Sequence, residues 1–204
     1  MLSAGLERIL YGAAKIAFLG NFLTWRLFGN FITDHTEPNT PTQFYLTMIM
    51  IGLNLYFQFS GASDIAIGFA RCLGFRVMEN FKWPLLATSL PEFWRRWHIS
   101  LTSLVREYVF FGVSAISRNH IFAALISMLA IGLWHEFSMR YVLWGLYHGL
   151  GIAIWQAFER RFPEHRGAFH KMLGWFITMH FVFFGFYFVR LDDPIGTLWK
   201  MIMR

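Results

Sequence analysis

The sequence predicts an all-α protein, a polytopic transmembrane helical bundle with an interfacial amphipathic helix. Of its 204 residues, 56% are hydrophobic and 20% are aromatic, whereas only 15% are charged. A soluble domain usually has about 25% charged residues. Apolar runs alternate with short basic stretches, which is typical of a helical protein that crosses a membrane several times.

The basic charge indicates a membrane surface and not a nucleic acid. The formal net charge is +6, and the basic residues gather between the apolar runs and at their ends. At such positions they meet lipid headgroups and set the topology. Membrane lipid is therefore an expected partner, and no nucleic-acid module is expected.

Five apolar stretches are expected to span the bilayer, within a single transmembrane domain over residues 1–204. A span takes about 17–25 mostly apolar residues. Lys15 and Arg26 interrupt the first stretch, and the third is short for a span. The expected spans are residues 9–31, 42–60, 120–134, 141–158 and 172–189.

Residues 61–119 are expected to form an interfacial or re-entrant region between the second and third spans. Residues 61–70 are rich in small side chains and too few to cross a bilayer alone, which suits a tightly packed or re-entrant helix. Within this segment, Asp64 is expected either to cap a helix or to pair with Arg71.

An amphipathic helix is predicted over residues 91–109. Pro91 suits the first turn of a helix, and large apolar side chains recur after it at helical spacing between flanking arginines. A helix of this kind lies in the membrane interface. Trp94 and His98, which are one turn apart, would then stack on one face.

The distribution of charge predicts five spans with the N-terminus inside the cell. Residues 32–41, the first expected external loop, contain no lysine or arginine, whereas residues 71–118 contain several. Basic residues are enriched in cytoplasmic loops. This arrangement places His98 toward the cytoplasmic side and His135 toward the external side.

His98 and His135 are the leading candidates for chemistry, because each follows a tryptophan in an apolar setting. An imidazole near lipid is costly unless it is paired or used. His135 is either a general base that accepts a hydroxyl proton or an interfacial histidine bonded to a backbone carbonyl. His98 is a base, an orienting donor or a plain interfacial histidine. Glu136 follows His135, but adjacent helical residues point in different directions, so it is not automatically the partner of that imidazole.

His148 lies between Gly145 and Gly149, a spacing that favours close helix packing. Its ring is also a candidate to reach the same cavity as His135.

Arg95 and Arg96 are equally suited to phosphate groups and to lipid headgroups. No metal site is expected, because the eight histidines include no His-x3-His pair with a carboxylate on one helix. Cys72 is the only cysteine, so no intrachain disulfide is possible.

Several segments together resemble the membrane-bound O-acyltransferase family, in particular the bacterial branch that acylates polysaccharides and teichoic acids. The resemblance runs through most of the chain and corresponds to roughly the C-terminal half of such an enzyme. It rests on residues 7–12, 60–68, 79–81, 93–101, 132–135 and 143–149.

The resemblance implies a multi-pass protein of the bacterial cytoplasmic (inner) membrane. In this reading His135 is the catalytic histidine and His98 the second active-site histidine, and both line a tunnel across the membrane. An acyl group, commonly acetyl, passes from a cytoplasmic thioester to a hydroxyl of an exported polysaccharide. The donor is an acyl-CoA or an acyl-carrier-protein thioester, and no bound cofactor is expected. Substrate contacts are expected from Trp94, Arg95, Arg96, Trp97, Trp134, Glu136, His148 and Asp64.

The chain departs from the family pattern at Glu136, where the family usually has glycine. A carboxylate there either raises the basicity of His135 or obstructs the tunnel. A second chain with the N-terminal spans, or a periplasmic acyltransferase, is an expected partner. The alternatives are a non-catalytic or truncated membrane subunit that needs a partner chain, and a helical bundle that transports a small polar molecule.

Overall fold

The computed structural model of the protein describes residues 2–32, 40–161 and 167–191. The regular structure of these residues is helical throughout, without strands, which confirms the all-α prediction. Contacts divide the chain into two compact units, Met1–Phe81 and Lys82–Arg204. The expectation of one domain over residues 1–204 stays a prediction.

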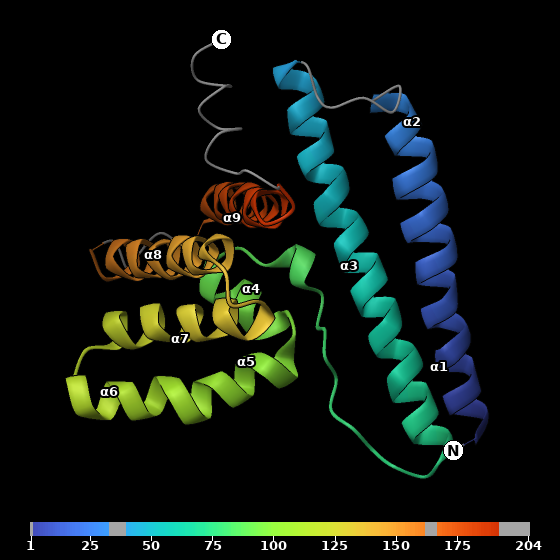
Figure 1. Ribbon diagram of the computed structural model, residues 1–204, viewed down its shortest axis with the longest axis horizontal. Coiled ribbons are helices and arrows are strands. Elements are labelled where there is room, and N and C mark those ends of the chain that lie inside the picture. The colour runs from blue at the N-terminus through green and yellow to red at the C-terminus, as the bar shows by residue number, and fades with distance from the viewer. Residues whose placement is uncertain (1, 33–39, 162–166, 192–204) are drawn as a thin grey trace. The chain divides into compact units, whose positions relative to one another are not determined.

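The first unit contains two long antiparallel helices (Figure 1). The first of these has a π-helical middle part and consists of α1 (Leu2–Ala14), η1 (Lys15–Phe28) and α2 (Gly29–Ile32). The second is α3 (Pro41–Cys72), which packs along the first. Thr40 caps α3, because its hydroxyl oxygen accepts a hydrogen bond from the backbone N–H of Gln43 at 3.2 Å.

Helix α3 is longer than the span expected over residues 42–60. It continues for 32 residues, which corresponds to about 48 Å, whereas the hydrocarbon core of a bilayer is about 30 Å thick. Residues 61–70 therefore do not form a separate helix, and of the two alternatives expected for them the structure shows the tightly packed one. They continue α3 without a break.

Glycine contacts explain how closely this small-residue segment packs against the first long helix. A Cβ atom at Gly12 would lie 2.5 Å from the backbone oxygen of Gly61, and one at Gly68 would lie 2.7 Å from that of Gly5. Both distances are too short for a side chain. Glycines at these positions let the two backbones approach closely, as small residues do between membrane helices.

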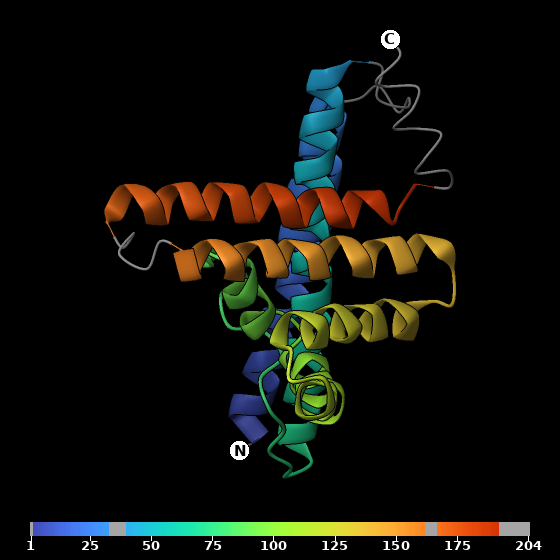
Figure 2. The same ribbon diagram turned by 90° about the vertical axis from the view of Figure 1, so that its left-hand side faces the viewer.

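The second unit holds the histidines of interest and is also helical (Figures 1 and 2). Its short elements are η2 (Pro84–Leu86), α4 (Leu90–Arg96), α5 (Ile99–Val105), η3 (Arg106–Phe110) and α6 (Phe111–Ser117). Its longer helices are α7 (His120–His135), α8 (Met139–Arg161) and α9 (Ala168–Phe188). In Figure 2, α8 lies between α7 and α9.

Helices α7 and α8 form a tight hairpin whose contact again depends on glycine. A Cβ atom at Gly132 would lie 2.4 Å from the backbone oxygen of Tyr141, and one at Gly145 would lie 2.7 Å from that of Met128. The predicted packing role of the segment around Gly145 is therefore confirmed. Because of this hairpin, the end of α7 lies beside the start of α8.

Two helical stretches of the described residues are long and apolar enough to cross a membrane: Ile99–Ser117 and Ala168–Phe188. His120–His135 is apolar but shorter. The first stretch falls in the region expected to be interfacial, and the second overlaps the expected span over residues 172–189. The five-span arrangement itself stays a prediction.

Candidate active site

The amphipathic helix predicted over residues 91–109 is interrupted at Trp97 and His98. Helix α4 ends at Arg96, Trp97 is extended, and His98 has left-handed backbone angles of φ 46° and ψ 54°. Helix α5 starts at the next residue, and the His98 carbonyl accepts the backbone N–H of Thr102 at 2.9 Å. A left-handed non-glycine residue costs about 1–3 kcal/mol and is concentrated at functional sites.

This interruption sets the direction of the His98 ring. The expected stacking of Trp94 on His98 is wrong, because the two residues no longer share a helical face. The ring of His98 instead lies edge-to-face against Trp134, with the ring centroids 6.0 Å apart. The ring of Trp134 also contacts that of His135, at 4.9 Å. The structure therefore brings His98 and His135 to the same tryptophan.

The half-buried His98 imidazole precedes the apolar stretch Ile99–Ser117. Burial lowers its pKa below the ordinary value for histidine, and the nearby His135 lowers the pKa further. Its Nδ1 lies 3.4 Å from the hydroxyl oxygen of Ser100. A histidine with a lowered pKa is neutral near pH 7, and in a neutral imidazole one ring nitrogen carries a hydrogen and can donate while the other can accept.

His135 is the last residue of α7 and lies in an exposed aromatic setting. Its ring stacks on Tyr141, with the centroids 5.6 Å apart, and meets Trp144 edge-to-face at 6.0 Å. Neither ring nitrogen forms a hydrogen bond to any residue that the structure describes. The imidazole is thus oriented by aromatic contacts, and its nitrogens are open to a substrate hydroxyl.

Glu136 does not pair with His135. Its carboxylate accepts a hydrogen bond from Arg140 at 2.8 Å, and this bond lowers the pKa of Glu136. The two residues are four positions apart; Glu136 is exposed and Arg140 is partly exposed. The structure therefore gives the carboxylate its own cation. Glu136 lies just beyond the end of α7 in extended backbone, so the directions of adjacent helical side chains are not the reason.

His148 is completely buried and lies behind the residues that hold His135. Its ring contacts Trp144 at 4.6 Å and Trp94 at 5.1 Å, and Trp144 in turn contacts His135. Neither nitrogen of His148 has a hydrogen-bond partner among the described residues. A Cβ atom at Gly185 would lie 2.4 Å from Nε2, so this position has no space for a side chain.

The remaining residues of the Trp-Arg-Arg-Trp segment have separate environments. Trp97 is a core residue that stacks on Phe93, with the centroids 5.4 Å apart. Arg96 forms an ion pair with Glu92 at 2.6 Å. Burial opposes ionisation of Glu92, but hydrogen bonds from Thr88 and the charge of Arg96 outweigh it and lower the pKa of Glu92. Arg95, by contrast, lines a cavity.

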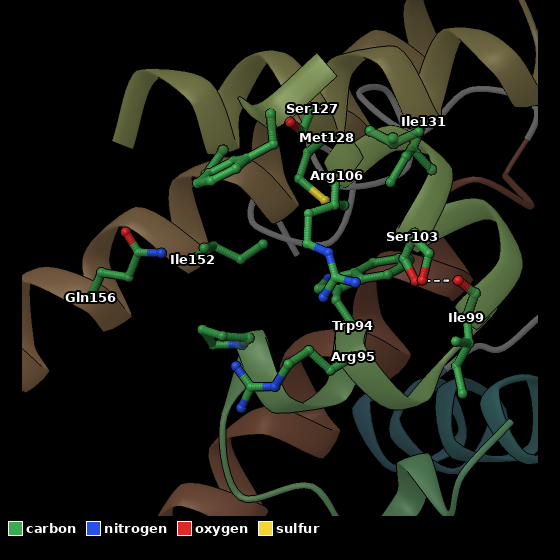
Figure 3. Close-up of a pocket in the computed structure, with 15 residues that line it drawn as sticks. Trp94, Arg95, Ile99, Ser103, Arg106, Ser127, Met128, Ile131, Ile152 and Gln156 are labelled. Carbon is green, nitrogen blue, oxygen red and sulfur yellow. Dashed lines mark hydrogen bonds between the residues drawn. The ribbon is translucent and has the colours of Figure 1, made fainter. Parts of the chain in front are cut away.

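This cavity has a volume of about 510 Å³ and lies between α4, α5, η3, α7 and α8 (Figure 3). Its walls are mostly apolar, and two guanidinium groups, those of Arg95 and Arg106, extend into it. Helix α5, which starts directly after His98, contributes Ile99, Thr102 and Ser103 to the lining.

Asp64 belongs to the first unit, where it accepts from Arg8 at 2.8 Å and from Lys15 at 2.5 Å. Arg8 also pairs with Glu79. Asp64 lies in the middle of α3, so neither expectation, a cap or a pair with Arg71, is correct. Its expected contact with substrate stays a prediction.

Sequence reasoning missed Tyr141, Trp144 and Arg106. Tyr141 and Trp144 reach His135 because the chain turns back after α7. The expected spans over residues 120–134 and 141–158 imply that turn, but they do not identify which side chains after it face His135. Arg106 interrupts an apolar stretch, which was a usable signal, since a charge in such a stretch needs a reason.

A family model described as MBOAT, membrane-bound O-acyltransferase family, matches residues 2–191. The chain belongs to the membrane-bound O-acyltransferase family. With its helical architecture, this makes it a membrane protein of that family.

Three bacterial relatives of this MBOAT chain have names that describe the transfer of an acetyl or alanyl group. A probable alginate O-acetylase of Pseudomonas fluorescens is 36% identical over 193 residues, which are 86% of this chain and 37% of the relative. A peptidoglycan O-acetyltransferase of Helicobacter pylori is 30% identical over 86% of this chain and 34% of the relative. A teichoic acid D-alanyltransferase of Streptococcus thermophilus is 29% identical over 91% of this chain and 51% of the relative. The chain therefore spans between about a third and a half of the length of these relatives.

Proposed function

We propose that this chain carries the catalytic histidine pair of a membrane O-acyltransferase that acylates a hydroxyl of an exported polysaccharide. The observation that supports this most strongly is that the rings of His98, at the start of α5, and His135, at the end of α7, both contact the ring of Trp134. The named relatives acylate envelope or exported polymers, and their names motivate the choice of acceptor.

In the proposed reaction, His135 accepts the proton of the acceptor hydroxyl as its oxygen attacks the carbonyl carbon of a thioester. A C–O bond forms, and negative charge develops on the carbonyl oxygen. A ring N–H of neutral His98 donates a hydrogen bond to that oxygen. The C–S bond then breaks, and the imidazolium of His135 returns the proton to the thiolate. The products are an ester and a free thiol.

The proposal includes a location and a direction. The chain is a multi-pass protein of the bacterial cytoplasmic membrane, with the donor thioester on the side of the basic segment that contains His98. The acceptor approaches from the opposite side, toward His135. The distribution of lysine and arginine along the sequence supports this orientation. An acyl-CoA or an acyl-carrier-protein thioester is the proposed donor.

The test is acyl transfer from a labelled acetyl thioester to polysaccharide in membranes that contain the chain. The native chain is compared with His135→Ala and with His180→Ala as the matched control. His180 is also a histidine on an apolar helix of the second unit. Its Nδ1 lies 2.7 Å from the backbone carbonyl oxygen of Phe176 in the same helix. We expect loss of transfer in His135→Ala alone. Equal transfer by native and His135→Ala chains would refute the assigned base.

A second arm of the same assay addresses the non-catalytic alternative. That alternative requires a partner chain that supplies further spans. The assay is therefore repeated with such a chain co-expressed. Transfer that requires both chains and His135 would identify a divided enzyme. Transfer that requires both chains but is unaffected by His135→Ala would assign this chain a non-catalytic role.

A further inference from the structure

We propose that residues 73–78 form a loop that binds the surface of an anionic lipid leaflet. Apolar side chains of the loop lie in the interface between water and hydrocarbon, and Arg71 and Arg76 contact lipid phosphates. The loop follows α3 directly and belongs to the first unit. Such binding is independent of the proposed acyl transfer, because it involves neither a thioester nor an acceptor hydroxyl.

The start of the loop is fixed by the way in which α3 ends. Gly74 has a left-handed φ of 90°, and the backbone N–H of Phe75 donates to the carbonyl oxygen of Ala70 at 2.8 Å. This is the geometry of a helix end that is terminated by glycine, in which the last carbonyls find donors. A residue with a Cβ atom would be strained at this φ, so the chain leaves α3 at a defined point.

The far end of the loop is held on the same pair of helices. Glu79 forms an ion pair with Arg8 of α1, and the side-chain amide of Asn80 donates to the hydroxyl oxygen of Ser63 of α3 at 3.1 Å. Residues 73–78 therefore connect two fixed points of the first unit. All of them are exposed.

The loop combines exposed apolar side chains with a backbone that has no partners. Leu73 is 75% exposed and Phe75 is 66% exposed, and Val77 and Met78 are also exposed. The backbone groups of residues 76–78 form no hydrogen bond with any residue that the structure describes. Large apolar side chains are disfavoured in water, whereas unpaired N–H and C=O groups are not tolerated in hydrocarbon. The membrane interface satisfies both requirements.

The exposed apolar surface of the helix pair continues as far as the loop. Phe69, in the last turn of α3, is exposed, and so is Leu2 at the start of α1. These two helix ends lie side by side (Figure 1), since a Cβ atom at Gly5 would lie 2.5 Å from Sγ of Cys72. Apolar side chains that are exposed at this end of both helices indicate that lipid extends to it. The loop would then lie at the level of the headgroups.

The charge of the segment favours an anionic leaflet. Neither Arg71 nor Arg76 forms a side-chain hydrogen bond or an ion pair within the described part of the chain. The next carboxylate along the chain, that of Glu79, already pairs with Arg8. Guanidinium groups bind phosphates well, and the cytoplasmic leaflet is negatively charged. The distribution of lysine and arginine predicts that residues 71–118 lie on that side.

The experiment measures how strongly brominated lipids quench a fluorophore on the loop. The full chain with Cys72→Ala and Val77→Cys has one cysteine, which is labelled, and it is reconstituted into vesicles of phosphatidylcholine. Brominated phosphatidylglycerol or brominated phosphatidylcholine is then added in increasing proportion. We expect both to quench, and phosphatidylglycerol to bind about 25-fold more tightly, about fivefold for each arginine. Arg71→Gln and Arg76→Gln should each remove about fivefold.

The matched control for charge is Arg26→Gln. Arg26 is an exposed arginine of the same unit, in η1 and toward the opposite end of the helix pair, so its loss should leave the ratio of the two binding constants unchanged. Arg76→Lys keeps the charge and should keep most of the ratio, which separates loss of charge from a change in the loop. Phe75→Ser should reduce quenching by both lipids, because it removes an apolar side chain from the interface.

Three results would overturn the proposal. Quenching by neither lipid would show that the loop lies in water or is covered by protein, and quenching by aqueous iodide would identify the first case. Equal binding constants for the two lipids would exclude recognition of an anionic headgroup. Equal effects of Arg26→Gln and Arg76→Gln would show that the charge of the loop is not responsible. His135→Ala should give native quenching even if acyl transfer is never detected.

Discussion

Substitution of Gly132 by alanine tests the hairpin that positions His135. Gly132 is one turn before His135 on α7, and a Cβ atom there would lie 2.4 Å from the backbone oxygen of Tyr141 on α8. Ordinary van der Waals contact begins near 3.4 Å, so the two helices would have to separate by about 1 Å. The obstacle is a backbone oxygen, which cannot rotate away as a side chain would.

The energetic cost follows from two opposing effects. Overpacking of this kind costs about 1–3 kcal/mol. Alanine in place of glycine favours a helix by about 1 kcal/mol. The net destabilisation of Gly132→Ala is therefore about 0–2 kcal/mol. The ring of Tyr141 stacks on His135, so a displacement of about 1 Å would also misplace the imidazole, at a cost of about 100-fold in rate.

The matched control is Gly112→Ala. Gly112 also lies inside a helix, α6, but a Cβ atom there meets nothing within 4 Å. In this variant only the higher helix propensity of alanine acts, without overpacking. The free energies of unfolding of the two variants should therefore differ by about 1–3 kcal/mol. Thermal unfolding followed by circular dichroism should place Gly132→Ala below Gly112→Ala by about 2–4 °C for each kcal/mol. Equal melting temperatures, together with native acyl transfer by Gly132→Ala, would refute the reasoning.

Three further predictions use the same assays. The pKa of His98 is lower in the folded chain than in the unfolded chain. Below the ordinary histidine pKa the unfolded chain therefore binds more protons than the folded chain. The free energy of unfolding should fall as pH drops from about 7.5 to 5.5. His98→Asn, which tolerates the left-handed backbone, should reduce this fall in a melting series across pH, and an unchanged pH dependence would contradict the assignment. Glu136→Gly should keep acyl transfer within about tenfold of native, because Glu136 pairs with Arg140 and not with His135, whereas a larger loss would place the carboxylate in the site. Gly185→Ala should destabilise the chain by about 1–3 kcal/mol through its collision with His148 Nε2. Adding His148→Ala should make the combined effect less than additive in thermal unfolding, and strict additivity would exclude direct contact.

The two catalytic candidates were predictable because the apolar chain makes each imidazole conspicuous. His98 and His135 were selected as functional residues from their apolar settings and from the family resemblance, and the structure brings both to Trp134. The close packing around Gly145 was also predictable, because glycines four residues apart lie on one helical face. These signals are local in sequence.

Features that depend on distant partners were not predictable. Asp64 pairs with Arg8 and Lys15, which are 56 and 49 positions away, and nothing in its own segment identifies them. The interruption at Trp97 and His98 contains neither glycine nor proline, and the apolar spacing continues across it. At this interruption Trp97 packs in the core against Phe186 of α9, with the ring centroids 4.9 Å apart, a tertiary contact that periodicity does not report.

The central claim is that His98 and His135 act as one unit at Trp134, and a double-mutant cycle in the acyl-transfer assay tests it most directly. The rates of His98→Asn, His135→Ala and the double variant are compared with the native rate. Residues that act together are strongly non-additive, so the double variant should be about as slow as the slower single variant. If the logarithms of the two single losses instead add up to that of the double variant, the two histidines act independently and the account of a shared site is wrong.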